Sequence, residues 1–216
     1  MLATASEREP DRDHLSTPRP WTWSNSAGLD VHGFVHPPTT AEVSAPDGEL
    51  PPLLVLDVNH GGGTSYGRAY RERLTGQWGV VDIDDVVCGV RSLADAGRID
   101  RDRVAIRGGS AGGYTVLRAL TSSTVFAAGA SYFGISDLAA VHHVADLHGE
   151  LLLLQGADDL VVPVAQAQLM ADAMRAAGKD VELVVYEGEG HGFRQTSTII
   201  DSLERELAFY LRVFEG

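Results

Sequence analysis

The chain has 216 residues, a formal net charge of −13 and a sequence pI near 4.9. Hydrophobic residues make up 44% and charged residues 22%, which is the balance of a globular protein with a substantial core. The negative charge disfavours nucleic acid and anionic membranes as partners, because both would be repelled. The single cysteine, Cys88, excludes an internal disulfide. Together with a polar N-terminus unlike a signal peptide and no apolar run of membrane-spanning length, this predicts a cytoplasmic protein.

The N-terminal part of the chain divides at about residue 20. Residues 1–20 carry charges and prolines without hydrophobic periodicity, which predicts a disordered arm or the remnant of an upstream domain. Residues 21–216 are expected to form a single domain. Trp21 and Trp23 alternate with polar residues, as on an edge strand, and residues 31–36 predict the next strand.

A nearly continuous apolar run at 53–58 is typical of a parallel strand covered on both faces. It ends in Asn59-His60-Gly61-Gly62-Gly63-Thr64, and glycines after a buried strand let backbone N–H groups approach a ligand closely. A phosphate cradle is disfavoured, since the Gly-Lys-Ser/Thr of a P-loop is absent. An oxyanion-binding loop fits better.

Further along the chain, apolar strands alternate with helices of 3.6-residue periodicity, which predicts a mostly parallel α/β sheet flanked by helices. Strands are expected at 103–107, 125–132, 150–155 and 181–186, and helices at 82–96, 111–120, 163–177 and 198–214. The first helix begins with Asp82, Asp84 and Asp85, which the helix dipole explains better than a metal site. The last helix is expected to turn inward Ile199, Ile200, Leu203, Leu207, Tyr210, Leu211 and Phe214.

One stretch stands out as a nucleophile elbow. Gly108-Gly109-Ser110-Ala111-Gly112 matches G-x-S-x-G between a predicted strand and a predicted helix. This turn holds a serine in a strained backbone geometry, and side chains two residues to either side would collide. Ser110 is therefore the candidate nucleophile, and the N–H of Ala111 a candidate oxyanion donor.

Acyl transfer by a serine also needs a base and a carboxylate that orients the base. The chain order of α/β-hydrolases is Ser, Asp/Glu, His. Here Ser110, Asp158 or Asp159, and His191 follow in that order, each on a loop after a predicted strand. Because the carboxyl ends of parallel strands meet at one edge of the sheet, these side chains are expected to converge.

Other polar clusters have simpler explanations. His142, His143, Asp146 and His148 are crowded, but adjacent histidine side chains diverge and no second ligand cluster stands out. Arg68, Arg71 and Arg73 are explained by a solvated helix face. We therefore expect neither a metal nor an organic cofactor.

The chain resembles the catalytic domain of the prolyl oligopeptidase family, close to bacterial dipeptidyl aminopeptidases and acylaminoacyl peptidases. The resemblance rests on Gly-Gly-Ser110-Ala-Gly-Gly-Tyr, on Leu-Leu-Leu-Gln-Gly-Ala-Asp-Asp159-Leu-Val-Val-Pro, and on Gly-Glu-Gly-His191-Gly-Phe. It implies an α/β-hydrolase fold and a serine hydrolase that cleaves short peptides or acyl-peptides. In the family the triad acid is the third residue after the strand-end glycine, which implies Asp159 rather than Asp158.

The chain departs from the family in three ways. The β-propeller that restricts access in the family is not recognisable in these 216 residues, and a catalytic domain without it is expected to have surface that a homo-oligomer could cover. The strand at 53–58 looks like two family strands merged into one, so the sheet is expected to have at least one strand fewer, with Gly61 or Gly62 as the second oxyanion donor. Most of the segment that walls the substrate pocket is missing between residues 135 and 148. A small-ester carboxylesterase and an impaired hydrolase-like scaffold are therefore the alternatives.

Overall fold

A computed structural model describes residues 15–39, 50, 53–136 and 141–215 of the chain. They group into two compact units, one of Met1–Thr75 with Asp84–Asp100, and one of Gly76–Ile83 with Arg101–Gly216. Each unit is described by itself. The division into an arm at 1–20 and one domain at 21–216 stays a prediction. Residues 1–14 lie outside the described part, and the first strand begins at Arg19.

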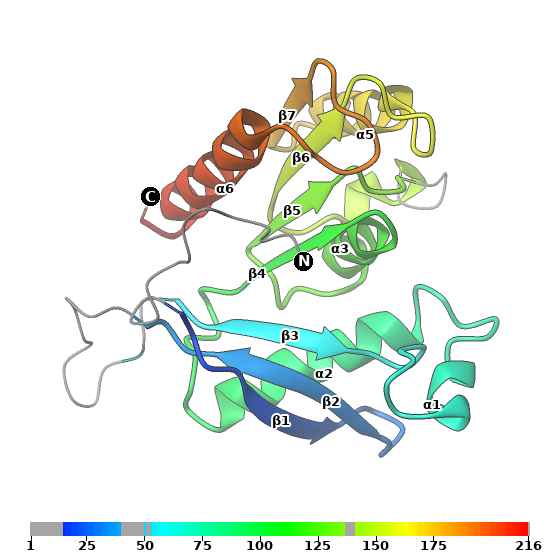
Figure 1. The fold of residues 1–216 in the computed structure, drawn as a ribbon, viewed down its shortest axis with the longest axis vertical. Helices are drawn as coiled ribbons and strands as arrows, with labels where there is room; N and C mark the ends of the chain where they lie inside the picture. Colours follow the sequence, from blue (N-terminus) through cyan, green and yellow to red (C-terminus); the bar gives the residue numbers. More distant parts are fainter. Residues whose placement is uncertain (1–14, 40–49, 51–52, 137–140, 216) are drawn as a thin grey trace, which may run out of the picture. The chain divides into compact units, whose positions relative to one another are not determined.

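Most predicted elements are present within a few residues of the expected bounds (Figure 1). In chain order the elements are β1 (Arg19–Ser24), β2 (Asp30–His36), β3 (Val55–Asn59), α1 (Arg68–Glu72), α2 (Val81–Asp95), β4 (Ala105–Gly109), α3 (Ala111–Ser122), β5 (Ala128–Tyr132), the short 3₁₀ helix η2 (Val144–Asp146), β6 (Glu150–Gly156), α5 (Val164–Ala176), β7 (Val181–Tyr186) and α6 (Thr196–Glu215). No helix among the described residues is long and apolar enough to cross a membrane.

The first unit contains an antiparallel sheet in the order β1-β2-β3. Trp23 on β1 is buried against α2, where its ring NH donates to the carbonyl of Asp85 at 2.8 Å. Gly89 makes this contact fit, because a Cβ there would lie 2.7 Å from the Trp23 ring. Trp23 is therefore a packing residue, and β1 lies at the edge of its sheet, as the alternating pattern predicts.

The expectation of a parallel, doubly covered strand at 53–58 is wrong. β3 pairs antiparallel with β2, with Leu56 opposite Val35. Leu53 and Val55 are exposed, so the run is not covered on both faces. An apolar run reports a preference for burial but carries no information about the direction of the neighbouring strand.

The second unit contains a parallel sheet in the order β4-β5-β6-β7, with helices on both faces (Figure 1). On one face α3 packs so closely that a Cβ on Gly129 would lie 2.7 Å from Leu120. On the other face Leu152 and Leu154 of β6 form a core with Phe209 of α6. This confirms the predicted parallel α/β sheet flanked by helices.

Helix α6 turns a different face to the sheet than its apolar periodicity predicts. Its buried residues are Thr198, Ser202, Glu206 and Phe209. The residues expected inside, apart from the partly buried Tyr210 and Phe214, are exposed, namely Ile199, Ile200, Leu203, Leu207 and Leu211.

A buried carboxylate explains the orientation of α6. Oε2 of Glu206 accepts the hydroxyl of Tyr132 at 2.6 Å, and Oε1 accepts the hydroxyl of Tyr210 at 2.8 Å. Nε of Arg107 lies 2.8 Å from Oε1. With these partners the charge can be buried, since a buried carboxylate is tolerated when it is paired and hydrogen bonded. Burial and the Glu206 carboxylate raise the pKa of Tyr132, so its hydroxyl stays a donor.

Candidate active site

Ser110 lies at the turn between β4 and α3 with φ 54° and ψ −117°. A positive φ is strained for a residue with a side chain. Gly108 permits the turn, because a Cβ there would lie 2.3 Å from the carbonyl oxygen of Gly112. The expected steric need for glycine at 112 itself is wrong, since a Cβ on Gly112 would meet nothing within 4 Å. The elbow therefore depends on the first glycine of the motif.

The three predicted side chains converge in the second unit. Nε2 of His191 lies 2.8 Å from Oγ of Ser110, and its Nδ1 lies 2.9 Å from Oδ2 of Asp159. Because an ionised carboxylate only accepts hydrogen bonds, the Nδ1–H donates to Asp159 and Nε2 accepts the serine hydroxyl. The Asp159 side chain is fully buried, whereas that of His191 is 23% exposed. A substrate can thus approach the histidine but not the carboxylate.

The choice between the two aspartates follows from burial and hydrogen bonding. Asp158 is exposed, whereas Oδ1 of Asp159 accepts the N–H groups of Val161 and Val162 at 2.8 Å each. Burial raises the pKa of Asp159, but the N–H of Val162, the hydrogen bond from His191 and the N–H of Val161 outweigh it and lower the pKa below 3.8. The carboxylate is therefore ionised at neutral pH, as required to stabilise a protonated imidazole.

The sequence analysis did not identify Gln155, whose side chain donates a hydrogen bond to the Asp159 carboxylate. Its side chain is 1% exposed, and Nε2 donates to Oδ2 of Asp159 at 3.0 Å and to the carbonyl of Val162 at 2.9 Å. The available signal was a polar residue at a buried position at the end of an otherwise apolar strand. Buried amides are retained where their hydrogen bonds are satisfied.

An aromatic group and a cavity lie beside the elbow. Phe133 directly follows β5, has φ 37° and packs edge-on against the His191 ring at 5.1 Å between centroids. A cavity of about 340 Å³ is lined by Arg107, Gly108, Gly109, Tyr132 and Phe133. Its lining includes Gly109, the residue directly before Ser110.

The two glycines expected to provide the second oxyanion donor are already engaged within the first unit. The N–H of Gly61 donates to Oδ2 of Asp85 at 2.7 Å, and the N–H of Gly62 donates to the carbonyl of Tyr70 at 3.0 Å. Because an N–H with a close acceptor is not free for a substrate oxygen, these bonds argue against Gly61 and Gly62 as oxyanion donors, and their assignment stays a prediction. Ala111 remains the candidate, since it is the first residue of α3, where N–H groups have no intrahelical acceptor.

The remaining polar candidates form no metal centre among the described residues, where no three His, Cys, Asp or Glu side chains could hold an ion. Nδ1 of His143 lies 3.4 Å from Oδ2 of Asp146. Asp82 is buried and accepts the N–H of Gly79 at 2.6 Å and the hydroxyl of Thr115 at 3.0 Å. The acidic helix start thus orders neighbouring chain segments in addition to interacting with the dipole.

Comparison with known proteins gives consistent matches. Residues 53–148 and 136–216 match the model of the prolyl oligopeptidase family. A puromycin-hydrolysing peptidase of Mycobacterium tuberculosis is 38% identical with a TM-score of 0.91, over 94% of this chain and 40% of that one. Puromycin hydrolase is 32% identical with a TM-score of 0.93, over 98% of this chain and 41% of that one. Dipeptidyl aminopeptidase BIII of Pseudoxanthomonas mexicana is 29% identical in an alignment of 177 residues. The alignment covers 64% of this chain and 26% of that protein. The chain thus spans about a quarter to two fifths of the length of these relatives.

Proposed function

The chain belongs to the prolyl oligopeptidase family and has an α/β-hydrolase fold, and on that premise we propose that it carries the catalytic centre of a serine peptidase. The observation that supports this most directly is the continuous chain of hydrogen bonds from Ser110 through His191 to Asp159. Nucleophile, base and orienting carboxylate are the three parts that acyl transfer by serine requires.

The proposed reaction has two halves. Oγ of Ser110 attacks the substrate carbonyl carbon while its proton passes to Nε2 of His191, and Asp159 stabilises the imidazolium. The N–H of Ala111 stabilises the developing oxyanion. The proton on Nε2 then passes to the leaving amine, the C–N bond breaks and an acyl-serine remains. In the second half a water molecule gives a proton to Nε2 of His191 and attacks the acyl carbon. The bond between that carbon and Oγ of Ser110 then breaks, the proton on Nε2 returns to Oγ, and the acid is released.

For the substrate we propose short peptides or acyl-peptides. The relatives at 38% and 32% identity are described as puromycin-hydrolysing, and a dipeptidyl aminopeptidase is among the curated relatives. The test substrates are therefore puromycin, an aminoacyl anilide and an N-acyl-peptide. The cytoplasmic location and a homo-oligomeric state remain predictions.

A small-ester carboxylesterase is the second candidate. It is favoured by the engagement of the Gly61 and Gly62 N–H groups, which leaves Ala111 as the assigned oxyanion donor. Esters react more readily than amides, so they depend less on a second donor. The 2.8 Å distance between Ser110 and His191 argues against the impaired scaffold, which would separate the two side chains.

Labelling with a fluorophosphonate probe tests the assignment. The wild-type chain should be labelled covalently, Ser110→Ala should not, and Ser122→Ala, a serine at the exposed end of α3, should match the wild type. Equal labelling of the wild type and Ser110→Ala would overturn the proposal. Comparing p-nitrophenyl acetate with puromycin and an aminoacyl anilide then separates the two candidates, because an esterase would hydrolyse only the first.

A further inference from the structure

The base His191 sits on a loop with little regular structure of its own. Residues 187–195 join β7 to α6, and the bridge between Gly190 and Gly192 spans the histidine. Gly192 has φ 93°, a conformation that side chains rarely adopt. Because glycine allows many backbone conformations, flanking glycines alone would leave the ring poorly placed. Another group must therefore order the loop.

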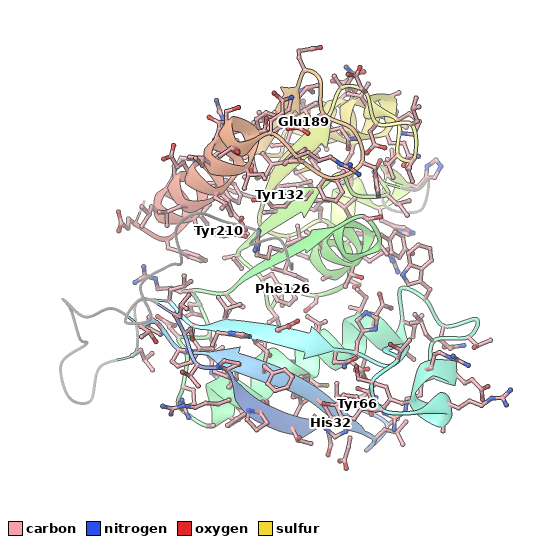
Figure 2. The ribbon with its side chains drawn as sticks, in the orientation of Figure 1. His32, Tyr66, Phe126, Tyr132, Glu189 and Tyr210 are labelled. Atoms are coloured by element: carbon pink, nitrogen blue, oxygen red, sulfur yellow. The ribbon has the colours of Figure 1, made fainter. Side chains whose placement is uncertain are left out.

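That group is the side chain of Glu189, which is 2% exposed and labelled in Figure 2 on the loop between β7 and α6. Its Oε2 accepts the N–H of Arg194 and its Oε1 accepts the N–H of Gln195, both at 2.9 Å. These bonds join the residue two positions before His191 to residues three and four positions after it. The carboxylate thus closes the loop into a ring with the histidine in its middle.

The main chain of Glu189 ties the same ring to the turn that carries the acid. Its carbonyl accepts the N–H of Asp158 at 2.9 Å, next to Asp159. The approach is so close that a Cβ on Gly156 would lie 2.4 Å from the carbonyl oxygen of Glu189. One residue therefore connects the histidine loop to itself and to the aspartate turn.

The chemistry of the contact requires a carboxylate. Burial raises the pKa of Glu189, but the N–H groups of Arg194 and Gln195 and the side chain of Thr198 outweigh it and hold the pKa below 4.5. An ionised carboxylate has two acceptor oxygens, which match two N–H donors. An amide would turn its own NH₂ toward one of those donors and leave one N–H unsatisfied.

We propose that Glu189 is the positioning residue that holds His191 between Ser110 and Asp159. The hydrogen bonds that it makes within the described part of the chain, those with Arg194, Gln195 and Asp158 among them, do not involve a reacting atom, so it acts through the loop. The catalytic consequence rests on the proposed function. The competing explanation is that Glu189 only stabilises the start of α6, and the test must separate stability from ring placement.

The first measurement compares Glu189→Gln with the matched control Glu187→Gln, an exposed glutamate two residues earlier in the same loop. A displaced base lowers the rate of chemistry more than substrate binding. We expect Glu189→Gln to lower kcat for an activated ester, and the rate of fluorophosphonate labelling, by about ten- to hundredfold. KM should change by less than about threefold, and the control should match the wild type.

The second measurement needs no substrate. In protein labelled with ¹⁵N-histidine, the Nδ1 proton of His191 that is bonded to Asp159 should give a downfield, slowly exchanging resonance. It should be lost or exchange faster in Glu189→Gln and persist in Glu187→Gln. If Glu189→Gln does not fold, Glu189→Asp carries the test, because it keeps the charge but is one methylene too short to reach both N–H groups.

A lowered melting temperature with an unchanged labelling rate and an unchanged His191 resonance would overturn the positioning role. Absence of labelling in the wild type would instead overturn the proposed function. In that case the resonance alone decides whether Glu189 places the ring, so the two failures remain distinguishable.

Discussion

The backbone N–H of Gly61 donates to Oδ2 of Asp85 at 2.7 Å. Oδ1 of the same carboxylate accepts the side-chain amide of Asn25 at 2.8 Å, and Asp85 is fully buried. The aspartate at the start of α2 therefore orders the glycine loop after β3, and by doing so it occupies the N–H that the sequence suggests for an oxyanion.

Replacing this carboxylate should weaken the first unit. Asp85→Asn keeps the size but points an NH₂ group at an N–H donor, so we expect the free energy of unfolding to fall by about 1–3 kcal/mol. Asp84→Asn is the control, because Asp84 accepts the N–H and hydroxyl of Ser26 at the surface. It should cost less than about 1 kcal/mol. Urea unfolding measures both, and equal losses would contradict the role of Asp85.

The elbow offers a matched pair of glycines. Gly108→Ala would place a Cβ 2.3 Å from a backbone oxygen, so the turn must shift, and we expect a loss of more than about 2 kcal/mol together with loss of Ser110 labelling. Gly112→Ala meets nothing within 4 Å inside α3 and should be neutral or stabilising by up to about 1 kcal/mol. A tolerated Gly108→Ala would show that the turn can relax.

Asp159 should make stability depend on pH in the acid range. Its folded-state pKa lies below 3.8, so its contribution to stability is fully present above that value and is lost as the pH falls through the lower folded-state pKa. The difference in free energy of unfolding between wild type and Asp159→Asn should therefore be largest near neutral pH and shrink below about pH 4. A difference that stays constant down to pH 2 would contradict this.

The same substitution should reduce catalysis, because an asparagine disfavours the Nδ1–H tautomer of His191. We expect kcat to fall by about 10⁴-fold, as judged from serine hydrolases in which the orienting carboxylate is replaced. The exposed neighbour serves as control, and Asp158→Asn should retain the activity of the wild type.

Gln155 should affect catalysis through Asp159, because its side chain donates to Asp159 and not to His191. Gln155→Leu removes the donor to the carbonyl of Val162 and one of the donors to Oδ2 of Asp159, and we expect a loss of about 1–3 kcal/mol with a lower kcat. Gln168→Leu, at an exposed position of α5, should change neither quantity. Thermal unfolding and single-turnover labelling measure the two effects separately.

The orientation of α6 can be tested with two truncations. Phe209→Ala removes a side chain that is 2% exposed and should cost about 3–5 kcal/mol. Leu207→Ala truncates a side chain that is 57% exposed and should cost less than about 1 kcal/mol. A larger loss for Leu207→Ala than for Phe209→Ala would show that α6 buries the face that the periodicity predicts.

Local patterns in the sequence determined much of this protein. Apolar runs and 3.6-residue periodicity located the strands and helices, and parallel strands gather the loops that carry Ser110, Asp159 and His191 at one edge of the sheet. Their convergence follows from chain order and from the geometry of parallel strands. Residue type then predicts their chemistry, because few other side chains could perform it.

Only the tertiary structure decided where hydrogen bonds end and which helix face is buried. The hydrogen bond of the Gly61 N–H could not be predicted from local sequence, because its acceptor, Asp85, is 24 residues away. The prediction of the buried face of α6 was wrong because the buried Glu206 carboxylate accepts a hydrogen bond from Tyr132, which lies 74 residues earlier. The roles of Gln155 and Glu189 also depend on hydrogen-bond partners that the sequence does not specify. A buried polar group is tolerated only when its partners are in place, and those partners come from distant parts of the chain.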